Sequence, residues 1–241
     1  KLSNLLQDVP PARLFDEILK LLMSGHSWAA IQGLRNAGLH HGLLPLLDQI
    51  LDSNADSKGA NDFVKLALAN TDNRIQSGKS VSAGFLFATL LWPDLLKNWK
   101  ANIAKGISNI PALLDAMDDT IAAQSSGMTI QRRFESDMRE IWSMQPRFEK
   151  RVGRYPYRLI ESPRFRAGYD FMLLRCATGE QDPAIGQWWT NFISADPAGQ
   201  EALMASAKTE LGSNPSSPAK RRRRRKPKAG TPAENNQPQQ T

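Results

Sequence analysis

The chain has 241 residues, with 31 lysines and arginines against 24 aspartates and glutamates, and a formal net charge of +7. This length suffices for one large domain or two modest ones with a buried core. The one cysteine, Cys176, excludes an internal disulfide and suits the reducing cytoplasm. The most apolar stretch, residues 81–92, is too short for a membrane span, which needs about 20 residues, so we expect a buried helix there.

In chain order, apolar positions recur three and four residues apart, which predicts an all-α fold: an irregular array of about ten helices. Proline starts a helix at Pro10–Pro11 and another at Pro93, and Ser82 is a plausible cap. Glycines end helices at Gly25 and Gly38. The predicted helices cover residues 10–24, 27–37, 40–52, 59–77, 83–92, 93–105, 108–124, 129–145, 162–178, 183–194 and 197–211.

The excess charge lies at the C-terminal end. Residues 213–241 hold eight basic side chains and one acidic side chain, a net charge of +7, so residues 1–212 are neutral overall. This segment is rich in Pro, Ser, Asn and Gln and almost free of apolar residues, so it cannot bury enough surface to offset its conformational entropy. We predict a disordered basic tail that binds polyanions; a purely solubilising tail is the alternative.

The sequence offers little for catalysis. It has no glycine-rich phosphate loop of either common type. Its three histidines do not combine with Cys176 or with carboxylates at a zinc-binding spacing. We therefore predict no catalytic residue and no metal ligand in this chain.

Residues 131–175 combine arginines with aromatic residues. Ten arginines, one lysine and six acidic residues give this segment a net charge of +5. Arginine forks bind phosphates, and aromatic faces stack on unpaired bases, so the composition indicates RNA or phosphate contact. The alternative is that the aromatics are core and the arginines pair with acids nearby. We favour the core interpretation for most of the aromatics, and RNA or phosphate contact for the arginines. The aromatics are Phe134, Trp142, Phe148, Tyr155, Tyr157, Phe165 and Tyr169; the candidate acids are Glu135, Asp137, Glu140 and Glu161.

Four motifs, in this order, resemble bacterial poly(A) polymerases. They are PPARLFDEILKLLMSG (10–25), NTDNRIQSGKSVSAGFLFATLLWPDLL (70–96), LIESPRFRAGYDFMLLR (159–175) and QWWTNF (187–192), and an arginine-rich extension follows them. The resemblance implies template-independent addition of AMP from ATP to RNA 3′ ends with Mg²⁺, producing tails that mark RNA for decay. It also implies a catalytic head with a Gly-Ser pair and an Asp-x-Asp motif.

That head is missing from the sequence. No Asp-x-Asp occurs, and the one Gly-Ser pair, Gly212–Ser213, opens the tail. We expect ATP and Mg²⁺ to bind the missing head, and no cofactor to bind this chain. The resemblance divides the chain into a neck and RNA-binding region (1–80), an arginine-rich helical body (81–212) and the basic tail (213–241).

The resemblance suggests roles for particular residues. A junction between head and neck would use Arg13, Asp16 and Glu17, which lie on one face of the first helix. Single-stranded RNA 3′ ends would contact the body at Arg132, Arg133, Arg164 and Arg166, and the tail at Arg221, Arg222, Arg223, Arg224, Arg225 and Lys226. Two alternatives stay open: the body of a CCA-adding tRNA nucleotidyltransferase, or a helical docking module for an RNA helicase or RNA-decay protein.

Overall fold

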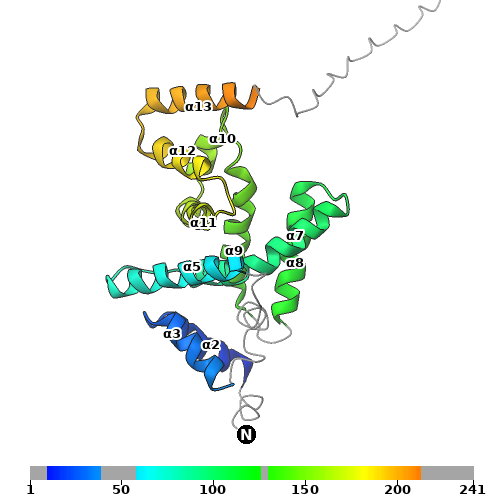
Figure 1. Ribbon diagram of the computed structural model, residues 1–241, viewed down its shortest axis with the longest axis vertical. Coiled ribbons are helices and arrows are strands. Elements are labelled where there is room, and N and C mark those ends of the chain that lie inside the picture. Colours follow the sequence, from blue (N-terminus) through cyan, green and yellow to red (C-terminus); the bar gives the residue numbers. More distant parts are fainter. Residues whose placement is uncertain (1–9, 39–57, 126–129, 213–241) are drawn as a thin grey trace, which may run out of the picture.

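The computed structural model describes residues 10–38, 58–125 and 130–212 (Figure 1). These residues form eleven α-helices, one short 3₁₀-helix and no strand, which confirms the all-α prediction. The predicted helix 40–52 and the tail 213–241 lie outside the described residues. The helices are α2 (Pro11–Leu22), α3 (Ser27–Asn36), α5 (Lys58–Gln76), α6 (Ala83–Leu90), α7 (Trp92–Ala104), α8 (Asn109–Ser125), α9 (Arg132–Met144), η2 (Gln145–Arg147), α10 (Tyr155–Ile160), α11 (Phe165–Ala177), α12 (Pro183–Ser194) and α13 (Pro197–Gly212).

The local signals in the sequence set most of these boundaries. Helix α2 begins at Pro11, and Gly25 and Gly38 follow α2 and α3 with φ of 82° and 66°, the left-handed region that favours glycine. The Ser82 hydroxyl caps α6 by accepting a hydrogen bond from the backbone N–H of Phe85 (3.3 Å). These contacts confirm the predicted starts and stops.

The apolar stretch 81–92 forms a buried helix, as predicted. Seven of the eight residues of α6 are buried. Among the residues that the structure describes, no helix has the length and apolar character needed to cross a bilayer. The helix instead contributes to a protein core.

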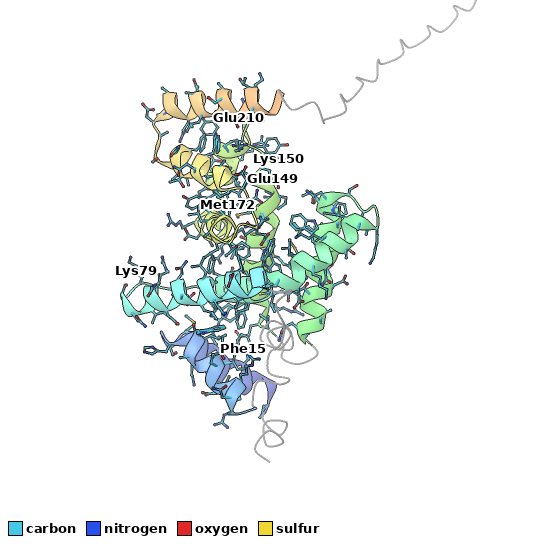
Figure 2. The ribbon with its side chains drawn as sticks, viewed as in Figure 1. Phe15, Lys79, Glu149, Lys150, Met172 and Glu210 are labelled. Carbon is cyan, nitrogen blue, oxygen red and sulfur yellow. The ribbon has the colours of Figure 1, made fainter. Side chains whose placement is uncertain are left out.

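The first hydrophobic core joins α2, α3 and α5–α9. Phe15 of α2 stacks on Phe87 of α6 and on Phe134 of α9, with ring centroids 5.4 and 5.9 Å apart (Figure 2). The indole N–H of Trp142 in α9 donates to the backbone carbonyl of Ala88 in α6 (3.1 Å). The polar atom of this buried aromatic side chain is therefore satisfied inside the core.

A second hydrophobic core joins the end of α9 to α10–α13. The indole N–H of Trp189 donates to the carbonyl of Phe148 (2.8 Å), and Trp188 stacks on Phe192 with centroids 4.9 Å apart. In Figure 1, α11, α12 and α13 stack at the end of the molecule opposite α2 and α3. The QWWTNF motif thus supplies the aromatic centre of this core.

Helix α11 belongs to both cores. Phe171 and Leu174 pack in the first core, where the Phe171 ring meets Trp92 edge-on at 5.0 Å. Tyr169 and Met172 pack in the second core. The two cores are therefore joined through one shared helix, while the boundary predicted near residue 80 stays a prediction.

One helix was not predicted. Helix α10 (Tyr155–Ile160) lies where we expected a linker, because Gly153 and Pro156 are typical of turns. Pro156 is instead in the first turn, where its missing N–H removes no intrahelical hydrogen bond. Buried Leu159 then anchors the helix in the second core.

The fold contains one carboxylate with an unfavourable environment. Asp94 is in the first turn of α7, and its Oδ2 is buried without a hydrogen-bond partner. Burial raises the pKa of the Asp94 carboxyl above its usual range, while Lys97 opposes the shift. The folded protein therefore holds this proton to a higher pH than the unfolded chain does.

We expect Asp94→Asn to change the pH dependence of stability. Between the unfolded pKa, near 4, and the higher folded pKa, the folded state binds more protons, so stability falls as pH rises through this window. Asp94→Asn should lack this decline, which urea unfolding at about pH 4 and about pH 7 measures. The control, Asp115→Asn, removes an exposed carboxylate of α8, and its stability should fall between these pH values as that of the wild type does. Equal declines for both variants would contradict the prediction.

Candidate nucleic-acid interface

The ten arginines of residues 131–175 fall into two groups. Five form ion pairs with carboxylates: Arg139, Arg151, Arg164, Arg166 and Arg175. Five are exposed and make no ion pair with any described residue: Arg132, Arg133, Arg147, Arg154 and Arg158. Half of the arginines in this segment thus present their guanidinium groups to solvent.

The aromatics of the same segment are mostly core. Six of the seven are buried or half-buried: Phe134, Trp142, Phe148, Tyr157, Phe165 and Tyr169. Tyr155 alone is exposed, at 56%. The core interpretation is therefore right for most of the rings, as the sequence indicated.

Arg132 and Arg133 open α9. Both are exposed, and the Arg133 guanidinium lies 4.4 Å from the centroid of the Phe134 ring. Phe134 in turn packs against the first core, so this cation–π contact fixes Arg133 against a rigid surface. Cations at a helix N-terminus are unfavourable, and a bound anion would relieve this.

The structure pairs the other two predicted arginines with acids. The Arg164 guanidinium is 2.5 Å from Asp137, and that of Arg166 is 3.0 Å from Asp170, four residues along α11. Asp137 is one turn after Arg133 on α9, so the structure brings Arg164 to the same half of α9 as Arg132 and Arg133. Arg166 is held against its own helix. An RNA role for the four stays a prediction.

Arg175 is buried, and its guanidinium contacts other side chains of the fold. Its side chain is 7% exposed and donates to Glu180 (2.8 Å), Gln145 (3.2 Å) and Gln181 (3.1 Å). The guanidinium also lies 4.9 Å from the centroid of the Trp92 ring. Arg175 therefore cannot reach a ligand on the surface.

Sequence reasoning did not single out the arginines around α10. Arg147 ends η2, Arg154 precedes α10, and Arg158 lies four residues after Arg154 on the same face. The missing signal was α10 itself, which was not predicted and which places Arg154 and Arg158 about one helical turn apart. These arginines form a second exposed basic group, at the opposite end of α9 from Arg132 and Arg133.

The residues of the predicted head–neck junction lie on the outer face of α2. Arg13, Asp16 and Glu17 are all exposed. Glu17 accepts from Lys20 (2.8 Å), and this hydrogen bond lowers the pKa of the Glu17 carboxyl. Within the described residues Arg13 forms no ion pair with its neighbours on the helix. A role at a junction stays a prediction.

The described residues offer no metal centre. Across 10–38, 58–125 and 130–212, no group of three or more His, Cys, Asp or Glu side chains is placed to hold a metal ion. The predicted RNA-contacting residues of the tail, Arg221–Arg225 and Lys226, lie outside the described residues. What the described residues can do chemically is bind anions.

Comparisons with known proteins agree with the sequence motifs. Residues 105–228 match the family model of the polymerase A arginine-rich C-terminus, and residues 1–51 match that of the probable RNA and SrmB-binding site of polymerase A. Poly(A) polymerase I of Salmonella typhimurium is 34% identical over 235 residues, and that of Escherichia coli O6:H1 is 33% identical over 235 residues. Poly(A) polymerase I of Haemophilus influenzae is 33% identical over 208 residues.

The coverage of these matches is unequal. The Salmonella and Escherichia alignments cover 96% of this chain but 49% of each relative, and the Haemophilus alignment covers 85% of this chain and 45% of the relative. The chain thus spans about half the length of the curated relatives it matches. The matched regions and the all-α fold show that the chain belongs to the poly(A) polymerase family and corresponds to its RNA-binding and arginine-rich C-terminal regions.

Proposed function

We propose that this chain is the RNA-holding part of a poly(A) polymerase and binds single-stranded RNA 3′ ends. The observation that carries the proposal is the set of five exposed arginines without an acidic partner in a body that is neutral overall. Their planar donors match phosphate oxygens.

Contacts of this kind suit a tailing reaction. Phosphate contacts carry no sequence information, so one surface can hold many RNAs. They also permit the strand to advance by one nucleotide after each addition, because every phosphate presents the same oxygens. The basic tail, with a net charge of +7, would add a non-specific electrostatic grip.

The chemistry of addition belongs to the parent enzyme in this proposal. A catalytic head would bind ATP and Mg²⁺ and transfer AMP to the 3′ hydroxyl, in the bacterial cytoplasm, with the tails promoting RNA decay. The chain has no Asp-x-Asp motif, and its described residues offer no carboxylate group for a metal. The proposal assigns to this chain the binding of RNA and the support of the head.

Protein docking is the second candidate. The family description that matches residues 1–51 includes a SrmB-binding site. A docking role for an RNA helicase or decay protein would therefore use the N-terminal region. RNA-independent capture of such a partner would favour it.

The test is RNA binding across a salt series with a variant of the tail. Fluorescence anisotropy with a short single-stranded RNA should give a slope of log affinity against log salt of about −3 to −5, since each phosphate neutralised contributes about −0.7. Changing Arg221–Arg225 and Lys226 to glutamine should weaken binding by about tenfold or more and remove most of the slope. We expect this loss because the variant lacks six positive charges that would otherwise contact RNA phosphates.

The control changes Lys97, Lys100 and Lys105 to glutamine; these exposed lysines lie on or next to α7, and none belongs to either arginine group. This variant should keep the wild-type slope. If the tail variant binds as the wild type does, the body arginines carry the affinity. If the wild type does not bind RNA at all, the proposed function is wrong and protein docking becomes the leading candidate.

A further inference from the structure

Tyr155 is the one exposed aromatic ring of this protein. The chain has 18 aromatic residues, all within the described residues, and the other 17 are buried or half-buried. The Tyr155 side chain is 56% exposed. The ring is therefore accessible to a ligand, and its surroundings indicate which kind.

Tyr155 is exposed although α10 packs well against the second core. Two residues along the helix, Tyr157 packs against Phe192 with ring centroids 5.5 Å apart. Pro156 and Leu159 are buried in the same helix. The second core therefore holds α10 firmly by its other side chains and presents Tyr155 from a fixed backbone.

One basic side chain contacts the Tyr155 ring, and two others are close to it along the chain. The Lys150 ammonium lies 5.1 Å from the ring centroid, Arg154 precedes Tyr155, and Arg158 follows it by three residues on the same helical face. Residues 147–158 contain five basic side chains and one acid, Glu149. Neither Arg154 nor Arg158 pairs with a carboxylate among the described residues. An aromatic face within a cluster of free cations is the combination that binds single-stranded nucleic acid.

The end of α13, the last described helix, lies beside this cluster. Arg151 is 3.7 Å from Glu210, in the last turn of α13, and this contact joins the loop before α10 to the end of that helix. Lys150 and Glu210 lie in the same region of the molecule in Figure 2, just beneath the end of α13. The sequence of the tail begins three residues after Glu210.

We propose that Tyr155 is a base-stacking site for single-stranded RNA, with Lys150, Arg154 and Arg158 contacting the phosphates on either side of the stacked base. This site deepens the proposed function and rests on it. The strand would pass from α10 to the tail without leaving a positive surface. The stack selects for an unpaired base, whatever its identity, because every base has a flat face.

The test uses the full chain and two ligands, a single-stranded oligoadenylate and a long-chain polyphosphate, which has the charge of RNA but no bases. Tyr155→Ala should weaken RNA binding by about 5- to 100-fold, with the salt slope unchanged because no charge is lost. Polyphosphate binding should stay within about twofold. Tyr155→Phe keeps the ring and should bind RNA as the wild type does.

The arginines of the cluster should behave differently. The double variant Arg154→Gln and Arg158→Gln should weaken both ligands and reduce the salt slope by about 1.4, at about 0.7 for each phosphate contact. Thermal unfolding checks that each variant is folded. RNA binding by Tyr155→Phe shows whether the aromatic ring suffices without the hydroxyl.

The outcomes separate the two proposals. If the wild type binds no RNA, the proposed function is wrong. If the wild type binds RNA and Tyr155→Ala binds equally well, or loses polyphosphate to the same extent, then Tyr155 does not stack on a base and the inference is overturned while the proposed function stands.

Discussion

Replacing Arg175 with alanine is expected to lower the free energy of unfolding by about 3–5 kcal/mol, the usual result of removing one partner of a buried ion pair. The guanidinium is 7% exposed and is held by Glu180, Gln145 and Gln181. Without it, the half-buried Glu180 carboxylate, which is 19% exposed, keeps one described donor, the indole N–H of Trp92 at 2.7 Å, and loses its partner charge. Urea unfolding followed by circular dichroism measures the loss.

Two comparisons isolate the cause. Arg166→Ala breaks an exposed ion pair on the same helix, in which the arginine side chain is 76% exposed, and should change stability by no more than about 1 kcal/mol. Combining Arg175→Met with Glu180→Gln removes both charges and should restore much of the stability that Arg175→Ala loses. If Arg175→Ala were no more harmful than Arg166→Ala, the buried network would not be a stabilising element.

The second large effect is expected at Gly84, where α6 and α9 approach most closely. A Cβ added at Gly84 would lie 2.5 Å from the Cβ of Asp137 and 3.0 Å from its Oδ2. The Cβ of Asp137 is fixed to the backbone of α9, so a rotamer change cannot relieve the clash and the helices must separate. Gly84→Ala should therefore lower the free energy of unfolding by about 1–3 kcal/mol, toward the upper value.

Gly33 provides the matched control for this substitution. It is also within a helix, α3, and its added Cβ would meet no atom within 4 Å. Gly33→Ala should raise the free energy of unfolding by about 0.5–1 kcal/mol, because alanine favours the helix. Both variants can be compared by urea unfolding. A Gly84→Ala protein as stable as Gly33→Ala would show that the two helices have room to spare.

The sequence predicted the fold class and most helix boundaries because their determinants are local. Apolar spacing, Pro11, Gly25 and the Ser82 cap act within a few residues. Helix α10 was not predicted because its proline is typical of a turn in isolation, whereas burial of Leu159 in the second core stabilises the helix. Tertiary packing, which no local pattern contains, decided that segment.

The candidate site was predictable in composition but not in geometry. The excess of five basic side chains over acidic ones in residues 131–175 follows from the sequence, but the sequence could not say which arginines lack an acidic partner. Arg164 pairs with Asp137 across 27 positions of the chain, a contact that depends on how α9 and α11 pack. The burial of Arg175 had one signal that was missed: it follows Phe171 by four residues and shares its buried helical face.

The sharing of α11 by two cores limits how this molecule can move. Domains that close on a ligand turn about a hinge, a few residues that few contacts cross. Here one helix packs in both cores, with Phe171 in the first and Met172 in the second. Rotation of one half against the other would therefore disrupt the packing of both cores. We therefore expect the two halves of the helical body to keep the same relative orientation when RNA binds, instead of closing on the strand and opening again.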